Sequence, residues 1–223
     1  MSKHIRMACL ALVTSFAIAP LAQAQSAGTW LLRAGPMLIA PQVDSGSMTA
    51  PSLPDTRIKV GSESTLGGGI SYMYTDNWSF DVPLAVPFTH HIKGDGAIAG
   101  VGEIATVKVV PATLFTQYRF YDAKAAWRPY VGLGVTYVSF IKETGNGTLT
   151  AITDPGGRTT VRVSDKFAIT PQVGMTYAVN DRVFVEAMVG QTLLKVTAKL
   201  STGQKIDAAL NPVIAGVYVG YRF

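Results

Sequence analysis

The sequence of 223 residues contains a single cysteine, Cys9, which lies in the amino-terminal apolar stretch. The rest of the chain therefore offers no disulfide, no thiol nucleophile and no thiolate ligand for a metal. Histidine is also scarce, and the two histidines beyond the first stretch, His90 and His91, are neighbours. Adjacent residues of a strand point to opposite faces, so this pair is poorly placed to chelate a metal. We therefore expect no metal and no other cofactor.

Two further features are missing after residue 24. No apolar run approaches the roughly 18 residues of a membrane-spanning helix. No basic run occurs either, although 19 basic and 14 acidic residues give a net charge of +5. The basic residues are scattered, which argues against nucleic acid as a partner. The spacing of Ser71, Thr89, His90 and Ser139 selects no nucleophile with a base and an orienting acid, so we expect no enzymatic activity.

The first 24 residues have the pattern of a secretory signal. Lys3 and Arg6 give a basic start, and an apolar stretch from Met7 to Ile18 follows. The small residues of Ala22-Gln23-Ala24 then form a cleavage site of the usual kind. We predict cleavage after Ala24, which leaves a single domain over residues 25–223.

Many segments of the sequence alternate between apolar residues and polar or small ones. The pattern is clearest in the last eleven residues. One face there is apolar and ends in Tyr221 and Phe223, while the other carries small residues, Tyr218 and Arg222. A period of two indicates a strand, and about 9–11 residues let a tilted strand cross a bilayer. An apolar outer face over a polar inner face is typical of transmembrane β-barrels. Bacterial outer-membrane barrels also end on such an aromatic, so we expect Tyr221 and Phe223 to be read by the barrel-assembly machinery.

Seven earlier segments alternate in the same way. They are residues 29–40, 64–74, 78–88, 104–120, 129–141, 167–179 and 183–198. Pro111 lies within the fourth, where we expect a bulge or kink because proline donates no ladder hydrogen bond. Long connections at 41–63, 89–103, 142–166 and 199–210 alternate with short ones at 75–77, 121–128 and 180–182.

These features predict an all-β fold: an eight-stranded antiparallel transmembrane β-barrel in the bacterial outer membrane. The long connections would be extracellular loops and the short ones periplasmic turns, beside which the aromatic residues gather as an interfacial girdle. A soluble β-sandwich would explain the alternation, but not the unequal connections, the girdle or the terminal Phe223.

Four stretches of the chain also carry a family resemblance. They are Trp30-Leu31-Leu32-Arg33-Ala34-Gly35, Tyr72-Met73-Tyr74-Thr75-Asp76-Asn77, Arg128-Pro129-Tyr130-Val131-Gly132-Leu133-Gly134-Val135-Thr136-Tyr137 and Gly220-Tyr221-Arg222-Phe223. In this order and spacing they resemble the outer membrane protein W (OmpW) family, which includes AlkL-type alkane-uptake barrels. The resemblance implies a narrow, largely hydrophobic lumen that takes in small apolar molecules and releases them sideways into the membrane.

The inward face decides whether an eight-stranded barrel is filled by side chains or holds one small ligand. By strand parity its periplasmic half is polar and carries Arg33, Asp81, Gln117, Arg119, Gln172, Glu186 and Arg222. Charged groups inside a barrel must pair or be solvated, so we predict a salt-bridged plug. The extracellular half is more apolar, and we expect a channel lining formed by Met37, Ile39, Pro83, Ala85, Pro87, Phe115 and Met188. Ordinary barrel packing of these seven side chains is the alternative.

The leading hypothesis is an outer-membrane channel for passive uptake of small hydrophobic molecules. A plugged lower lumen would force the solute out through the barrel wall, where Pro83, Pro87 and Pro111 lack ladder donors. The alternative is a structural or surface-interaction barrel that acts through its extracellular loops. Outer-membrane lipids are partners under either hypothesis, and small hydrophobic solutes are partners under the first.

Overall fold

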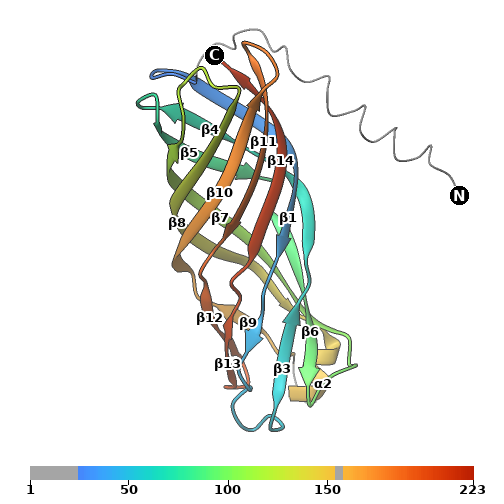
Figure 1. Ribbon diagram of the computed structural model, residues 1–223. Coiled ribbons are helices and arrows are strands. Elements are labelled where there is room, and N and C mark those ends of the chain that lie inside the picture. Colours follow the sequence, from blue (N-terminus) through green and yellow to red (C-terminus); the bar gives the residue numbers. More distant parts are fainter. Residues whose placement is uncertain (1–24, 154–157) are drawn as a thin grey trace, which may run out of the picture.

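The computed structural model describes residues 25–153 and 158–223, so the predicted signal segment lies outside the described residues. Eight antiparallel strands form a closed barrel, in which each strand pairs with the next and the last pairs with the first (Figure 1). These strands are β1 (Trp30–Ala40), β4 (Glu63–Met73), β5 (Trp78–Ala85), β7 (Glu103–Arg119), β8 (Trp127–Gly145), β10 (Lys166–Ala178), β11 (Val183–Gln191) and β14 (Val213–Arg222). The predicted eight-stranded antiparallel barrel is confirmed.

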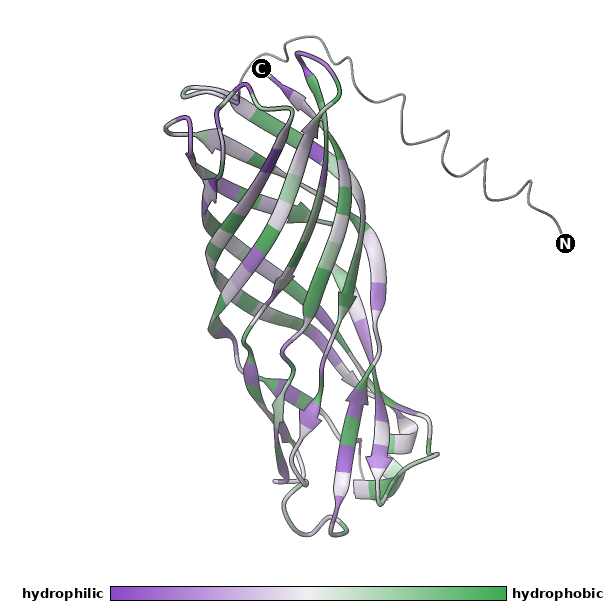
Figure 2. Cartoon of the chain, viewed as in Figure 1, coloured by the Kyte–Doolittle hydropathy of each residue, from purple (hydrophilic) through white to green (hydrophobic). Residues whose placement is uncertain are grey.

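The barrel turns its apolar side chains outward. In β14, Val217 and Val219 are 59% and 61% exposed, whereas Tyr218 between them is buried. Figure 2 shows bands of apolar and polar residues alternating along much of the barrel wall. Such a continuous apolar surface is suited to lipid rather than to water. The only helix in the described residues, α2 (Gly147–Thr153), is too short to span a membrane.

The segments expected as long extracellular loops contain further ordered elements. They contain β2 (Asp44–Ser45), β3 (Thr56–Val60), β6 (Phe88–Gly96), β9 (Val161–Val163), β12 (Lys195–Leu200) and β13 (Lys205–Ala209). We call this part, together with α2, the extracellular extension; it lies at the end of the barrel opposite the carboxyl terminus (Figure 1). Single apolar residues such as Ile104, Leu149 and Ile206 pack together there into a core. The sequence did not reveal this core, because isolated apolar residues in Gly- and Lys-rich segments show no period until distant segments meet.

Two of the predicted strands are broken. The segment predicted at 78–88 ends as β5 at Ala85 and resumes as β6 at Phe88, and the segment at 183–198 divides into β11 and β12. At Pro111, where a bulge or kink was expected, β7 stays in register with β8. On the other edge of β7 the six residues 82–87 face the five residues 110–114, so the irregularity near Pro111 lies on that side. The register of β7 with β8 shifts instead between Thr106 and Lys108.

The wall between β5 and β7 is incompletely paired. The last ladder pair between these strands joins Asp81 to Phe115, and pairing resumes where Phe88 of β6 meets Val109. Residues 82–87 and 110–114 thus border each other without ladder pairs among the described residues. We call this the wall gap; Pro83, Pro87 and Pro111 all lie on its edges. A proline is tolerated there because no partner strand needs its missing N–H.

Candidate functional site

The periplasmic half of the barrel holds an ion-pair network centred on Arg33. Its guanidinium donates to both carboxylate oxygens of Asp81, at 2.5 and 3.0 Å, and its Nε lies 3.2 Å from Glu186 Oε1. Ser71 donates to Asp81 at 2.6 Å, and Tyr130 donates to Glu186 at 2.8 Å. All five side chains are buried. Alternation places them on the inner face, where each charged side chain has an ionic partner and at least one hydrogen bond. Arg33 Nε and Glu186 Oε2 make no hydrogen bond among the described residues.

A second group lies nearer the periplasmic turns. Arg119 donates to Gln117 Oε1 at 2.9 Å and to Gln25 Oε1 at 3.2 Å, and Ser79 also donates to Gln117. The Arg119 guanidinium lies 4.8 Å from the centre of the Tyr130 ring, which links the two groups. The predicted plug residues therefore lie together inside the barrel, including Arg222, whose guanidinium lies 5.8 Å from the Phe184 ring.

Sequence reasoning missed Gln25 as part of this group. Gln25 is buried, donates to Thr176 at 3.1 Å, and accepts a hydrogen bond from Arg128 through its backbone oxygen at 2.9 Å. It belongs to no strand, so no period could reveal that it fills the periplasmic mouth of the barrel.

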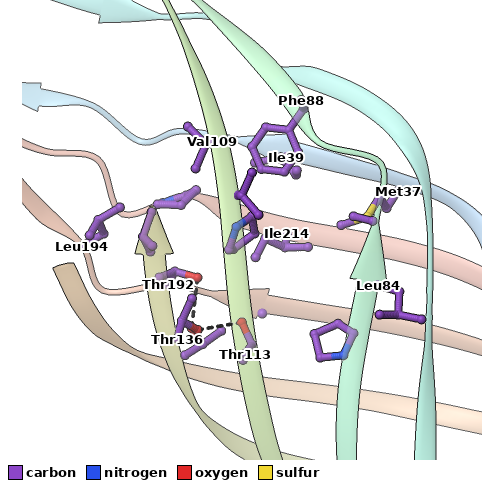
Figure 3. A pocket seen from close by; sticks show the side chains of 18 of the residues that line it. Met37, Ile39, Leu84, Phe88, Val109, Thr113, Thr136, Thr192, Leu194 and Ile214 are labelled. Atoms are coloured by element: carbon purple, nitrogen blue, oxygen red, sulfur yellow. Dashed lines mark hydrogen bonds between the residues drawn. The ribbon is translucent and has the colours of Figure 1, made fainter. Parts of the chain in front are cut away.

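Above the plug lies a cavity of about 150 Å³. An apolar cavity of this size holds a benzene-sized molecule. Figure 3 shows apolar side chains of β1, β6, β7 and β14 around it, among them Met37, Ile39 and Ile214. Every residue predicted as channel lining is among the residues that line it: Met37, Ile39, Pro83, Ala85, Pro87, Phe115 and Met188.

The cavity also reaches the wall gap. Residues from both of its edges line the cavity, including Leu84, Val86 and Val110. On the lipid side, Leu84 and Val86 are 51% and 59% exposed. The same side chains therefore border the interior and the lipid-facing surface.

Part of the lining was not foreseen. Four threonine hydroxyls form a row across neighbouring segments, in which Thr136 bonds Thr113 at 2.9 Å and Thr170 at 2.8 Å, and Thr170 bonds Thr192 at 3.0 Å (Figure 3). This threonine row gives the cavity one polar wall opposite the apolar side chains. Residues near the extracellular extension add apolar contacts that single-strand parity could not supply: Val60, Phe88, Phe140, Leu194 and Leu210.

His90 lines the cavity at its extracellular side. Burial lowers the pKa of its imidazole, and the hydrogen bond to the Gly61 carbonyl oxygen and the nearby Glu63 oppose this effect only partly. A neutral imidazole suits an apolar cavity. In the described parts of the chain no group of three or more His, Cys, Asp or Glu side chains could hold a metal.

Known proteins share this architecture along almost the whole chain. Residues 26–223 match the OmpW family. The chain is 33% identical to outer membrane protein W of Vibrio cholerae over 218 residues, which cover 96% of this chain and 97% of that protein. It is 31% identical to outer membrane protein AlkL of Ectopseudomonas oleovorans over 126 residues, 56% of this chain and 50% of that protein. The crystal structure of OprG from Pseudomonas aeruginosa superposes with a TM-score of 0.81 at 24% identity, covering 91% of this chain and 99% of that one.

These matches confirm the family resemblance, the barrel fold and the bacterial outer membrane as its location. The family is one of non-enzymatic barrels, in agreement with the lack of a triad spacing. The chain belongs to the OmpW family of outer-membrane β-barrel proteins.

Proposed function

We propose that this protein is a passive outer-membrane channel for small hydrophobic molecules. The observation that carries the proposal is the apolar cavity inside the barrel, which meets the wall gap on one side and the plug below. The solute would contact the seven channel-lining residues: Met37, Ile39, Pro83, Ala85, Pro87, Phe115 and Met188. Capture would occur through the extracellular extension, and the solute would then partition into the cavity by the hydrophobic effect.

The plug favours a sideways exit over a straight one. An apolar solute gains nothing by entering a network of buried ion pairs, and parting those pairs would leave charges uncompensated. Arg33, Asp81, Gln117, Arg119, Glu186 and Arg222 would thus close the path to the periplasm.

The wall gap supplies the exit in this proposal. Unpaired backbone groups are costly in hydrocarbon, but a proline has no N–H to leave unpaired. Pro83, Pro87 and Pro111 therefore lower the cost of holding the gap open. At about 3.3 Å per residue and a tilt near 45°, Pro87 lies about 20 Å above Trp78, within the outer half of the bilayer.

Uptake of a labelled small apolar solute into proteoliposomes tests the channel. The variant carrying Met37→Trp and Ala85→Trp fills the cavity, so we expect uptake to fall to the level of empty liposomes. A control variant carrying Val131→Trp and Val173→Trp adds two tryptophans to the lipid-facing surface, where both valines are exposed, and should retain uptake.

Uptake by the wild-type protein no greater than that of empty liposomes would overturn the channel. Attention would then turn to the second candidate, a structural or surface-interaction barrel acting through the extracellular extension. The ordered core of that extension is the observation that favours it.

A further inference from the structure

Two hydrogen-bond donors in the cavity wall have no acceptor among the described residues. Gln172 is 4% exposed, lines the cavity, and its Nε2 has no hydrogen-bond partner. Tyr218 is equally buried and lines the same cavity, and its hydroxyl makes none of the hydrogen bonds found in the described chain. Buried donors are nearly always paired, so Gln172 Nε2 indicates an acceptor on a bound molecule. The Tyr218 hydroxyl, which is not among the buried atoms without a partner, lines the same cavity and supplies a second donor.

The backbone makes room for Gln172. In register, Gln172 of β10 lies between Gly132 of β8 and Gly190 of β11. A Cβ atom on Gly132 would lie 2.8 Å from Gln172 Nε2, so the amide occupies the space that a side chain on β8 would fill. Its Nε2 is thus held beside the strands that carry the threonine row.

Tyr218 is held by a second glycine. Its ring lies over Gly216, two residues closer to the extracellular end of β14, and contacts the place where a Cβ of Gly216 would be. Gly216 pairs with Met37 on one side and with Met188 on the other. The hydroxyl therefore extends from the plug toward the level of the apolar lining.

The threonine row adds a third donor by hydrogen count. Its four hydroxyls carry one hydrogen each and make three bonds to one another. One O–H therefore remains, and the directions of the three bonds decide which of the four threonines carries it.

The charges around the cavity select a neutral acceptor. Arg33 also lines the cavity, but its guanidinium is already held by Asp81 and Glu186. A carboxylate head would gain no free cation there and would lie near two buried carboxylates. Burying such a charge without a partner is costly, whereas a neutral oxygen only needs a donor.

We propose that the cavity binds an amphiphile rather than a pure hydrocarbon, with a neutral carbonyl or ether oxygen accepting from Gln172 Nε2 and the Tyr218 hydroxyl. Its alkyl chain lies along Met37, Ile39 and Met188. This proposal rests on the proposed function, since it names the class of solute that the same cavity takes.

Methionine-methyl NMR of the full chain in lipid nanodiscs tests the proposal with 2-octanone, n-octane and octanoate as probes. Met37 and Met188 report on the cavity, whereas Met48, Met73 and Met175 lie in the extension, the plug and the lipid-facing surface as internal controls. After correction for partition into the lipid, we expect 2-octanone to bind at least tenfold more tightly than either n-octane or octanoate.

Gln172→Leu and Tyr218→Phe should each reduce the preference for 2-octanone over n-octane severalfold, while the affinity for n-octane changes little. Gln191→Leu and Tyr177→Phe remove the same groups outside the cavity lining and should leave the preference intact. Tyr218→Phe removes only an oxygen, so it remains informative if Gln172→Leu folds poorly.

The outcomes separate the two proposals. If 2-octanone and n-octane bind equally, or if neither cavity variant changes their ratio, the oxygen-binding proposal is overturned and the channel stands. Tighter binding of octanoate would overturn the choice of a neutral head. If no probe shifts Met37 or Met188, both the binding proposal and the cavity as the solute path are overturned.

Discussion

At the residue scale, glycines leave room for the side chains that line the cavity, and Gly216 is an example. The Tyr218 ring occupies the space that any side chain at position 216 would need. We expect Gly216→Ala to lower the free energy of unfolding by about 1–3 kcal/mol, because the ring must leave its position. Urea unfolding in detergent micelles measures the change. Gly147→Ala is the control, since nothing lies within 4 Å of a Cβ there; equal stability of the two variants would contradict the expectation.

His90 gives the protein a dependence on pH. Because burial lowers the pKa of this histidine, the unfolded chain, with an ordinary value of 6.5, binds a proton more readily than the folded one. The stability conferred by neutral His90 is therefore present above pH 6.5 and declines as the pH falls below that value. The groups that act on it are the Gly61 carbonyl, Glu63 and His91.

Unfolding measured between pH 5 and pH 7.5 should show this decline in the wild-type protein and a shallower one in His90→Gln. An unchanged slope in His90→Gln would assign the pH dependence to other groups.

Single residues also mark the limit of what the sequence could predict. A period of two assigns each strand residue to a face, so Met37, Met188 and Arg33 were correctly expected to point inward. Gln25 and Leu210 lie outside the alternating strands and could not be found in this way. The threonine row was missed for a different reason. Strand alternation shows which side chains point inward, but not which hydroxyls of different strands lie next to one another.

At the scale of elements, the plug ties β1, β4, β5 and β11 together. Asp81→Asn leaves Arg33 with Glu186 as its only ionic partner inside the barrel, and we expect a loss of about 3 kcal/mol in the free energy of unfolding. The exposed pair of Lys59 and Asp95 provides the control, since Asp95→Asn should destabilise the protein far less than Asp81→Asn. Similar losses in the two variants would show that the buried pair contributes no more than a surface one.

The wall gap permits a prediction about exit. Pro87→Ala together with Pro111→Ala restores two N–H groups at its edges, which should favour pairing across the gap. We expect solute uptake into proteoliposomes to slow, while binding detected at Met37 and Met188 persists. Pro36 lies on β1, away from the gap, so Pro36→Ala is the control and should leave uptake unchanged. Normal uptake in the double variant would remove the support for a sideways exit.

The sequence predicts a strand well where the alternation of apolar and polar residues lies within that strand. It predicts less well those features that depend on contacts with distant segments. All eight barrel strands begin within two residues of their expected starts, because each one alternates on its own, although β11 ends at Gln191 rather than at residue 198. The break between β5 and β6 could not be seen, since the alternation continues from Trp78 to Phe88 across it. Strand ends depend on which neighbour supplies a hydrogen bond, and that information lies elsewhere in the chain.

At the scale of the whole molecule, we expect the last residue to matter for assembly more than for stability. Phe223 is 72% exposed, and its ring contacts only Tyr221, at 4.8 Å between centres, among the ring pairs of the described chain. Phe223→Ala should therefore leave the unfolding midpoint nearly unchanged while slowing insertion by the barrel-assembly machinery. Pulse-labelled insertion into outer membranes measures the rate, with Val219→Ala as a lipid-facing control. An insertion rate equal to that of the wild type would contradict a role as assembly signal.

The wall gap also shapes the lipid around the protein. Backbone groups of residues 82–87 and 110–114 that point into the gap have no ladder partner, and hydrocarbon chains offer them none. Water or lipid headgroups must descend to meet them, whereas the fully paired flank of β10 and β11 makes no such demand. We therefore expect the bilayer to be thinner beside the wall gap than beside β10 and β11. Under the proposed function, a molecule leaving through the gap would enter the membrane at its thinnest point, with the shortest remaining distance to the inner leaflet.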